Sequence, residues 1–297
     1  MVVFYFQQAT WFLAKIMGFD SFVPKNNFLK KWIAYYYTDG SEKFDYRNSY
    51  LFYPHIYTTL SFYQNAEFRE ETGGNTIFYA PNIKYLKLVT QQTLPRCTTQ
   101  IGKTNKIAIA FKPLGLNHFI KENYARLVPR QVQIFAPQND SKWNELLEEL
   151  FVANSIKAKT EILDNFLVRQ FNGYENDLLK KAVEILSDIN NKSSIDEIAA
   201  SLHISRRTLL RYFKSELRVT PELFRSIVRF RFAISEKIVK NSNESLTKIA
   251  HEANFFDQAY FIKCFKRFTG VTPHQFFRQG TRIGQEDTFW TFNPQKT

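Results

Sequence analysis

The chain has 297 residues, of which 44% are hydrophobic and 23% charged, so it is not a disordered chain and is long enough for two domains with separate cores. Lysine and arginine outnumber aspartate and glutamate by 40 to 28, and the formal net charge of +12 favours a polyanionic partner, either nucleic acid or an anionic membrane surface. The two cysteines, Cys97 and Cys264, form neither a disulfide framework nor a zinc-ligand spacing, which is typical of a reducing cytoplasm.

The first 19 residues, MVVFYFQQATWFLAKIMGF, are strongly apolar. They lack the positive start and small-residue cleavage site of a signal peptide. Gln7, Gln8 and Lys15 also interrupt a run that is already short for a bilayer span. We therefore expect no membrane role, and we predict that this segment is the first strand and helix of the N-terminal domain, or an extension that precedes it.

Residues 24 to about 137 contain short apolar runs separated by turn signals. The runs are WIAYYY before Asp39-Gly40, YTTLSFY before Gln64-Asn65, TIFYA after Gly73-Gly74, and then YLKLV and KIAIAF. Their length and their content of Tyr, Phe, Ile and Thr predict β-strands. We expect a mainly antiparallel domain, either a barrel or a sandwich. Its aromatic side chains either fill the β core or line a ligand pocket.

Two stretches of helical period follow, SKWNELLEELFVA and IKAKTEILDNFLVRQF. They predict a helical hairpin that connects two domains or pairs two subunits. Gly173 then marks a boundary, after which the chain reads as helices with strong caps. The fold class that we predict is therefore α+β with two domains: a β-rich domain with a helical hairpin at residues 1–172, an all-helical domain at 173–282, and a C-terminal tail at 283–297.

The helical domain begins with an amphipathic helix, NDLLKKAVEILSDI. The capping box SIDE at 194–197 then starts a short helix that reaches Leu202, and Ser205 caps a second one. Thr220-Pro221 opens a long helix, in which apolar residues at spacings of three and four predict a buried stripe up to Ile238. A second pair of short helices follows from Ser245, and Thr272-Pro273 opens a closing helix.

The two helix pairs are versions of one another. SRRTLLRYFKSELRVTP at 205–221 corresponds to DQAYFIKCFKRFTGVTP at 257–273, at a constant offset of 52 residues. Phe-Lys and Val-Thr-Pro recur at matching places, together with the caps and the outward basic residues. Two unrelated amphipathic helix pairs would not share this detail, so we infer an internal duplication of a helix–turn–helix unit.

Residues 174–280 resemble the DNA-binding domain of the AraC family of bacterial transcription regulators. The resemblance is carried by IDEIAASLHISRRTLLRYFKSELRVTPELF, by IVRFRFA, and by SLTKIAHEANFFDQAYFIKCFKRFTGVTPHQFF. It implies two helix–turn–helix units joined by a long helix. Arg218 and Asn254 stand where the family usually has glycine. Asn tolerates the left-handed backbone that such a position requires, whereas this conformation is less favourable for Arg218. The N-terminal part resembles, more faintly, a domain that precedes the DNA-binding domain in some members, through FLKKWIAYYY and IAIAFKPLGLNHFI.

The resemblance implies double-stranded DNA as the partner, with a small effector, a homodimer and RNA polymerase as further expected partners of a cytoplasmic activator or repressor. A helix–turn–helix unit presents the N-terminal half of its second helix to the major groove. The expected DNA-binding residues are Ser205, Arg206, Arg207, Thr208, Leu210, Arg211 and Lys214 in the first unit, and Asp257, Gln258, Ala259, Ile262, Lys263 and Lys266 in the second. Arg207 and Arg211 suit guanine, Gln258 suits adenine, and Lys214 and Lys266 suit phosphate.

Other chemistry has little support in the sequence. The five histidines are scattered, and no nucleophile elbow, phosphate loop or dinucleotide fingerprint is present, so we expect no catalytic residue, cofactor or metal. Two alternatives remain open. One is an enzyme whose N-terminal domain holds a metal or small substrate and whose helices target it to DNA. The other is an architectural DNA binder without an effector.

Overall fold

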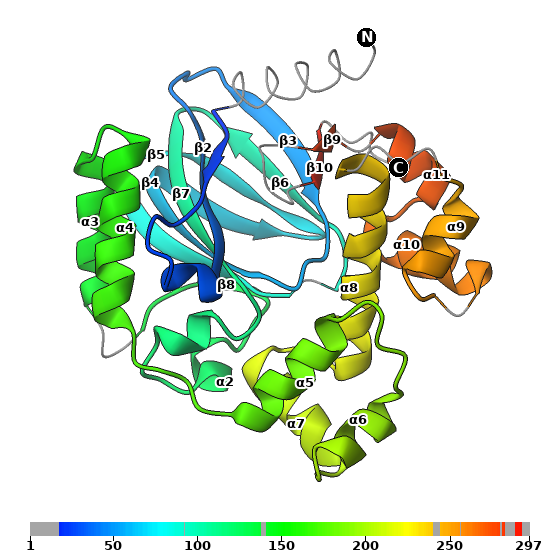
Figure 1. Ribbon diagram of the computed structural model, residues 1–297. Helices are drawn as coiled ribbons and strands as arrows, with labels where there is room; N and C mark the ends of the chain where they lie inside the picture. Colours follow the sequence, from blue (N-terminus) through cyan, green and yellow to red (C-terminus); the bar gives the residue numbers. More distant parts are fainter. Residues whose placement is uncertain are drawn as a thin grey trace.

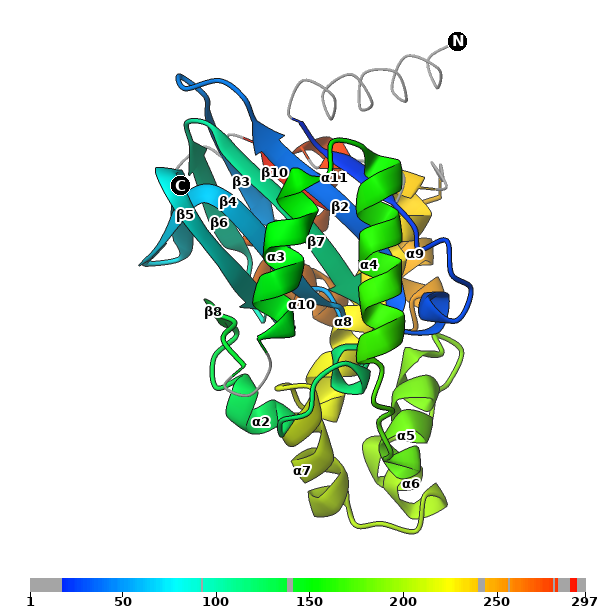
Figure 2. The same cartoon turned by 90° about the vertical axis from the view of Figure 1, so that its left-hand side faces the viewer.

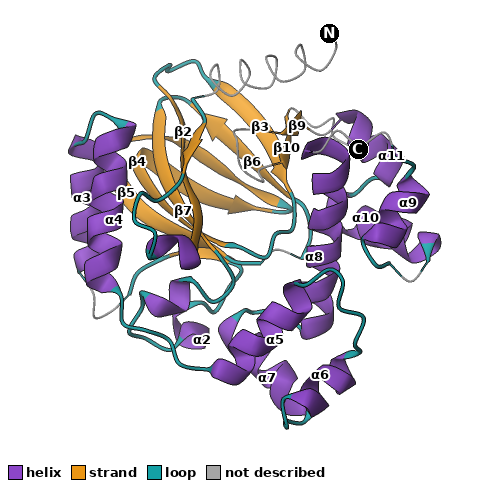
Figure 3. Ribbon diagram, viewed as in Figure 1, coloured by secondary structure: helices purple, strands orange, loops and turns teal. Residues whose placement is uncertain are grey.

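The computed structural model describes residues 18–91, 93–137, 141–239, 244–255, 257–279, 281–282 and 289–292. A curved β-sheet, a helical hairpin and a helical domain follow one another along the chain (Figures 1 and 3). This confirms the predicted α+β fold with a β-rich N-terminal part and a helical C-terminal part. The interpretation of the apolar first segment concerns residues 1–17, which lie outside the described part of the chain.

The elements have the following bounds. The strands are β1 (Asp20–Phe22), β2 (Ile33–Ser41), β3 (Arg47–Phe52), β4 (Thr58–Glu71), β5 (Gly74–Val89), β6 (Arg96–Ile101), β7 (Thr104–Phe111), β8 (Val132–Ile134), β9 (Thr281–Arg282) and β10 (Phe289–Phe292). The α-helices are α2 (Tyr124–Leu127), α3 (Lys142–Val152), α4 (Ile156–Gln170), α5 (Asp177–Ser187), α6 (Ile195–Ser201), α7 (Arg206–Glu216), α8 (Pro221–Ile234), α9 (Leu246–Glu252), α10 (Gln258–Thr269) and α11 (Pro273–Gln279). Short 3-10 turns η1 (Leu29–Lys31) and η2 (Leu116–His118) and a π-helical segment η3 (Ser235–Val239) complete the described elements.

The strands form one sheet in the order β1-β2-β7-β4-β5-β6-β3-β10-β9, and β8 also pairs with β5. Every described pair is antiparallel except β5 with β6. Of the two architectures that the sequence left open, the structure therefore has the barrel-like one, in which a single sheet curves around its own concave face (Figure 1).

Two predicted strand ends were wrong because the turn signals lie inside long strands. β2 continues through Asp39-Gly40, where glycine is needed because a Cβ on Gly40 would lie 2.4 Å from the Thr104 carbonyl oxygen. β4 continues through Asn65, whose positive φ of 54° accommodates a register shift against β5. TIFYA and YLKLV likewise belong to the single strand β5. Gly73, with a φ of 76°, does turn the chain between β4 and β5.

The period of two along the strands separates two kinds of side chain onto the two faces of the sheet. One face carries large apolar residues, which form the main core of the domain: Tyr36, Leu60, Phe62, Leu86, Leu88, Ile107, Ile109 and Phe111. Their sequence neighbours line the concave face instead and are mostly tyrosine, serine, threonine, alanine and lysine. The sheet thus has an apolar convex side and a polar, aromatic concave side.

The predicted helical hairpin is present as α3 and α4, and it covers the convex face of the sheet (Figure 2). Trp143, Leu146 and Leu150 of α3 and Leu163 and Leu167 of α4 are buried in the core that they share with the strands. The apolar stripes of both helices are therefore used within the subunit. Any pairing of two subunits through this hairpin would have to use its outer, mostly polar faces.

The helical domain is built around α8, which packs against both helix–turn–helix units. Phe224 of α8 lies in the core of the first unit, and Ile227 and Phe230 lie in the core of the second. The predicted long helix is α-helical up to Ile234 and continues as the π-helical segment η3 from Ser235 to Val239.

Part of the C-terminal tail pairs with the N-terminal sheet. Residues 289–292 form β10, which pairs antiparallel with β3 of the N-terminal sheet, with Thr291 opposite Leu51. β9, directly after α11, pairs with β10. The second helix–turn–helix unit is thereby attached to the edge of the N-terminal sheet, as Figure 1 shows beside α11.

Candidate nucleic-acid interface and internal cavity

The first helix–turn–helix unit consists of α6 and α7. The Ser194 and Glu197 capping box starts α6, and the Ser205 hydroxyl accepts a hydrogen bond from the Thr208 amide to start α7. Between them His203 adopts a φ of 55° in the turn. Leu209 and Phe213 are fully buried, so the opposite face of α7 is left for solvent.

The second unit repeats this construction with α9 and α10. Ser245 and Asp257 accept hydrogen bonds from the backbone amides of Lys248 and Tyr260 at the two helix starts. Asn254 holds a φ of 54° in the turn, as predicted for a residue that tolerates the left-handed region. Phe261, Cys264 and Phe265 of α10 are buried in the core of this unit.

The structure places the predicted DNA-binding residues on the outer faces of α7 and α10. Exposed are Ser205, Arg206, Arg207, Arg211 and Lys214 in the first unit, and Asp257, Gln258, Ala259, Lys263 and Lys266 in the second. Thr208, Leu210 and Ile262 are half-buried. Sequence reasoning overlooked Tyr260, whose side chain is 42% exposed on the first turn of α10. Its position in the first turn of the helix, directly after Gln258 and Ala259, could have identified it from the sequence.

Arg206 has a second role that its sequence position did not reveal. Its guanidinium forms ion pairs with Asp196 of α6 at 2.9 Å and with Glu222 of α8 at 2.7 Å. Both partners help to raise the pKa of Arg206, the hydrogen bond to Glu222 most strongly. Arg206 therefore connects the three helices around the first unit, and a phosphate would have to compete with two carboxylates for it.

The first unit also contacts the N-terminal domain. Asn117 of η2 donates a hydrogen bond of 2.9 Å to Glu216 of α7, and the Arg218 guanidinium donates one of 3.1 Å to the Pro129 carbonyl. Leu114 belongs to the same buried cluster as Phe213. Arg218 itself adopts a φ of 60°, so arginine occupies the left-handed conformation at the end of α7. Arginine therefore adopts a conformation that is unfavourable for a residue with a Cβ, as expected, and its side chain forms a contact between the domains.

The second unit contacts the N-terminal domain at a different place. Tyr53, which follows β3, is buried in the core of the second unit, and its ring meets Phe276 of α11 edge-on at 5.0 Å. Its hydroxyl also hydrogen-bonds the Thr291 side chain of β10. Each helix–turn–helix unit therefore rests on its own part of the N-terminal domain.

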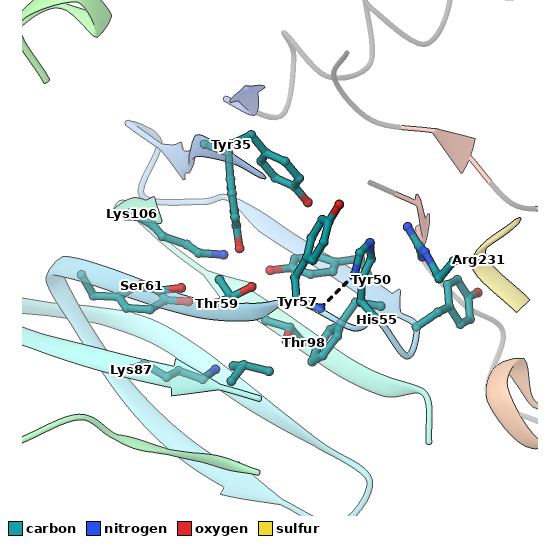
Figure 4. A pocket seen from close by; sticks show the side chains of 15 residues that line it. Tyr35, Tyr50, His55, Tyr57, Thr59, Ser61, Lys87, Thr98, Lys106 and Arg231 are labelled. Carbon is teal, nitrogen blue, oxygen red and sulfur yellow. Dashed lines mark hydrogen bonds between the residues drawn. The ribbon is translucent and has the colours of Figure 1, made fainter. Parts of the chain in front are cut away.

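A cavity of about 110 Å³ lies on the concave face of the sheet, where it meets α8. Its lining combines aromatic rings, hydroxyl groups and three basic side chains (Figure 4). It consists of Tyr35, Tyr37, Tyr50, Phe52, Tyr53, His55, Tyr57, Thr59, Ser61, Tyr63, Lys87, Val89, Thr98, Lys106 and Arg231. The sequence left open whether the aromatic residues fill the β core or line a pocket, and some of them line this cavity.

The basic residues of the cavity come from both domains. Lys87 of β5 and Lys106 of β7 belong to the sheet, whereas Arg231 belongs to α8 and is only 7% exposed. In Figure 4 the lysines and Arg231 lie on opposite sides of the tyrosine rings. Sequence reasoning did not single out Arg231, which is one of three arginines along α8.

The two lysines differ in their partners. Lys106 pairs with the buried Asp39 at 3.6 Å, and Asp39 also accepts a hydrogen bond of 2.9 Å from Gln100. Lys87 is 3% exposed and, among the described residues, forms no salt bridge or hydrogen bond; its ammonium lies 4.4 Å from the centre of the Phe68 ring, and Glu70 is the acid whose charge acts on it. Burial lowers the pKa of Lys87 well below its usual range, and the charges of Lys106 and Arg96 lower it further.

Residues 198–279 match the family model described as "Helix-turn-helix domain". The transcriptional regulator GbdR of Pseudomonas aeruginosa is 21% identical over 170 residues, which cover 57% of this chain and 45% of GbdR. The transcriptional activator RhaS of Mannheimia succiniciproducens is 31% identical over 120 residues, which cover 39% of this chain and 44% of RhaS. A crystal structure of ToxT from Vibrio cholerae matches 88% of this chain and 98% of its own at 15% identity, with a TM-score of 0.44.

The C-terminal domain of this chain is thus a helix–turn–helix domain. It is one of the AraC type, as the resemblance predicted, and the matched relatives are named as transcriptional regulators. The match spans less than half the length of those two relatives.

Within the described residues, no three His, Cys, Asp or Glu side chains gather closely enough to hold a metal ion. No helix in the same part of the chain is both long and apolar enough to cross a membrane.

Proposed function

We propose that this chain is a sequence-specific DNA-binding transcription regulator whose N-terminal domain binds a small effector. The observation that carries the proposal is the repeated helix–turn–helix unit, with the N-terminal half of each second helix exposed and basic side chains along it. B-form DNA admits one helix into the major groove, and two units can enter successive turns about 34 Å apart. The net charge of +12 favours the phosphate backbone.

The residues proposed to read bases are those nearest the starts of α7 and α10. Arg207 and Arg211 can each donate a forked pair of hydrogen bonds to guanine, and Gln258 suits an adenine edge. The exposed Tyr260 joins this set as a candidate for contact with a thymine methyl group or a sugar. Lys214 and Lys266 lie further along the helices and are proposed to contact phosphate.

Selection of binding sites from a random duplex library tests the proposal. The wild-type chain should enrich one bipartite sequence, and affinity should fall steeply as salt rises. Arg207→Ala or Arg211→Ala should each cost about 1–3 kcal/mol and relax the preference at one or two base pairs. Lys266→Ala serves as the matched control, because it should weaken binding to every sequence alike. Enrichment of no sequence at all would refute sequence-specific binding.

The effector that we propose for the cavity is a small organic anion with an aromatic or hydroxylated body. Lys87, Lys106 and Arg231 all line this buried space, and the side chain of Lys106 is paired with Asp39. Lys87 carries the argument, because a buried ammonium without an acceptor is costly and an anionic ligand would supply the missing partner. The tyrosine rings and hydroxyl groups suit the rest of such a ligand.

Coupling of the effector to DNA is proposed to run through α8. Arg231 reaches the cavity from the helix that packs against both DNA-binding units, and Tyr53 belongs both to the cavity lining and to the core of the second unit. A ligand that contacts these residues would change the position of α8 relative to the sheet. A homodimer, a contact with RNA polymerase and a place in the cytoplasm are proposed on the resemblance alone.

A further inference from the structure

Within the described residues, the turn of the second helix–turn–helix unit makes a polar contact with the connection that leads from α5 into the first unit. The side-chain amide of Asn254, in that turn, donates a hydrogen bond to the carbonyl of Ile189, which follows α5 in the connection to α6. The same connection between α5 and α6 is also held from α8, because Arg225 donates a hydrogen bond of 2.6 Å to the Ser193 carbonyl. Asp188 and Asn191 order the connection internally, through hydrogen bonds of 2.9 and 3.0 Å to the amides of Asn190 and Ser193.

The covalent path between the units does not explain their relative position by itself. α8 ends at Ile234, and the chain continues as the π-helical segment η3 before α9 begins at Leu246. A π-helical turn is a local irregularity of a helix rather than a rigid extension of it. The position of α10 relative to α7 therefore depends on packing against α8, which contacts the first core through Phe224 and the second through Ile227 and Phe230. Asn254 adds a direct contact between the second unit and the connection that leads into the first.

Asn254 suits this role because of its backbone conformation. Its φ of 54° belongs to the left-handed region, which glycine adopts most easily and which asparagine tolerates. Glycine at this position would satisfy the turn and leave the Ile189 carbonyl without this donor. The corresponding turn residue of the first unit, His203, has a φ of 55° and is exposed to solvent. The bridging side chain is therefore a property of the second unit only.

We propose that Asn254 is a positioning residue that fixes the distance and angle between the two recognition helices, and so makes the chain selective for the spacing of two DNA half-sites. The inference rests on the proposed DNA-binding function. One extra base pair moves a half-site by about 3.4 Å and turns it by about 34° around the helix axis. A rigid pair of units cannot follow that change, whereas a pair that has lost its bridge follows it more easily.

The test uses the full-length chain and the bipartite duplex that it selects. Affinity is measured for that duplex and for versions with one base pair inserted or removed between the half-sites. We expect wild type to lose about tenfold or more on either change, as for a badly mismatched base pair. Asn254→Gly, which the backbone accepts, should lose less than about threefold. Asn254→Asp keeps the size of the side chain but removes the donor, and it should behave as Asn254→Gly does.

The matched control is Asn82→Gly, which replaces another asparagine of positive φ, 64°, in strand β5 of the N-terminal domain. It should retain the wild-type spacing penalty. Thermal unfolding of all variants shows whether they are folded at the assay temperature. If either Asn254 variant keeps the full wild-type penalty, the positioning role is wrong while the DNA-binding function stands. If wild type selects no duplex, the proposed function fails and this inference fails with it.

Discussion

Replacing Lys87 by methionine should stabilise the ligand-free protein. Methionine keeps the length and most of the apolar volume of the lysine side chain, so packing against Phe68 and the neighbouring strands is largely retained. What the substitution removes is an ammonium group that is 3% exposed and that has no acceptor within the described residues. The stability of the chain should therefore increase, although the substitution alters the proposed binding site.

The size of the effect follows from two opposing terms. An unpaired buried charge costs several kcal/mol even after the protein relaxes around it. The Phe68 ring, 4.4 Å from the ammonium, returns about 1–2 kcal/mol as a cation–π interaction. The difference leaves a gain of about 1–3 kcal/mol in the free energy of unfolding of Lys87→Met at neutral pH.

The pH dependence provides a second signature of the same charge. Burial lowers the pKa of Lys87 below that of the unfolded chain, so the unfolded state binds the proton more tightly. Stability of wild type therefore rises with pH from the lowered pKa up to the ordinary lysine value of 10.5, where the cost of the charge disappears. The advantage of Lys87→Met should be largest below the lowered pKa, should shrink as the pH rises, and should vanish as the pH approaches 10.5.

Urea unfolding followed by tryptophan fluorescence measures this difference, because Trp32 and Trp143 both lie in the N-terminal domain. Lys43→Met, at an exposed position, is the matched control and should change stability by less than about 0.5 kcal/mol. Sodium benzoate serves as a test anion against sodium chloride of equal ionic strength. At ten times its dissociation constant it should stabilise wild type by about 1.4 kcal/mol and leave Lys87→Met unchanged. A Lys87→Met protein that is less stable than wild type and responds equally to benzoate would refute the reasoning.

Three further outcomes are expected. Burial lowers the pKa of His118 to about 4, so its contribution to stability is complete above pH 6.5 and is lost as the pH falls towards 4. Between pH 7.5 and 4.5, urea unfolding of His118→Phe should therefore lack about 2.5 kcal/mol of the decrease in unfolding free energy that wild type shows, and an identical decrease would exclude this histidine as its source. Arg218→Gly should leave the free energy of unfolding within about 1 kcal/mol of wild type, because glycine relieves the strain of the left-handed backbone and this offsets the lost hydrogen bond to Pro129. Hydrogen exchange of the backbone amides at residues 112–131 should become faster in this variant. Unchanged exchange would mean that Arg218 does not hold the two domains together. Lys214→Ala should reduce the log–log salt slope of DNA binding by about one unit, and a slope equal to that of wild type would remove Lys214 from the phosphate contacts.

The helical domain could be predicted in detail because its signals are local. The capping box at Ser194 and the caps at Ser205 and Thr220 each act over three or four residues, and the structure has all three. The internal repeat also allowed each unit to support the interpretation of the other. The family resemblance is confirmed by the comparisons, whereas the residues chosen to contact DNA remain predictions.

The N-terminal sheet was predicted less accurately because its pairing is not local. Gly40 and Asn65 read as turn residues, but one permits a close approach to β7 and the other forms a register shift within a long strand. Alternation in YLKLV places Lys87 and its neighbours on opposite faces without showing which face is enclosed. The pairing of β10 with β3 joins Thr291 to Leu51, some 240 residues apart, and no sequence pattern encodes that register.

Arg218 and Asn254, the two residues that stand where the family usually has glycine, make different contacts for the two duplicated units. Arg218 and its counterpart in the repeat, Gly270, end α7 and α10 with φ values of 60° and 80°. Only Arg218 has a side chain, and it uses it to reach the N-terminal domain. In the turns, His203 stays exposed, whereas Asn254 reaches across to the first unit. The first unit is thus held by the N-terminal domain through Asn117 and Arg218, and the second by Tyr53 of the N-terminal domain, by β10 and by the contact of Asn254. Any movement of α8 that a ligand in the cavity produces would therefore strain different contacts in the two units, so the effector should change their relative position rather than move them as one body.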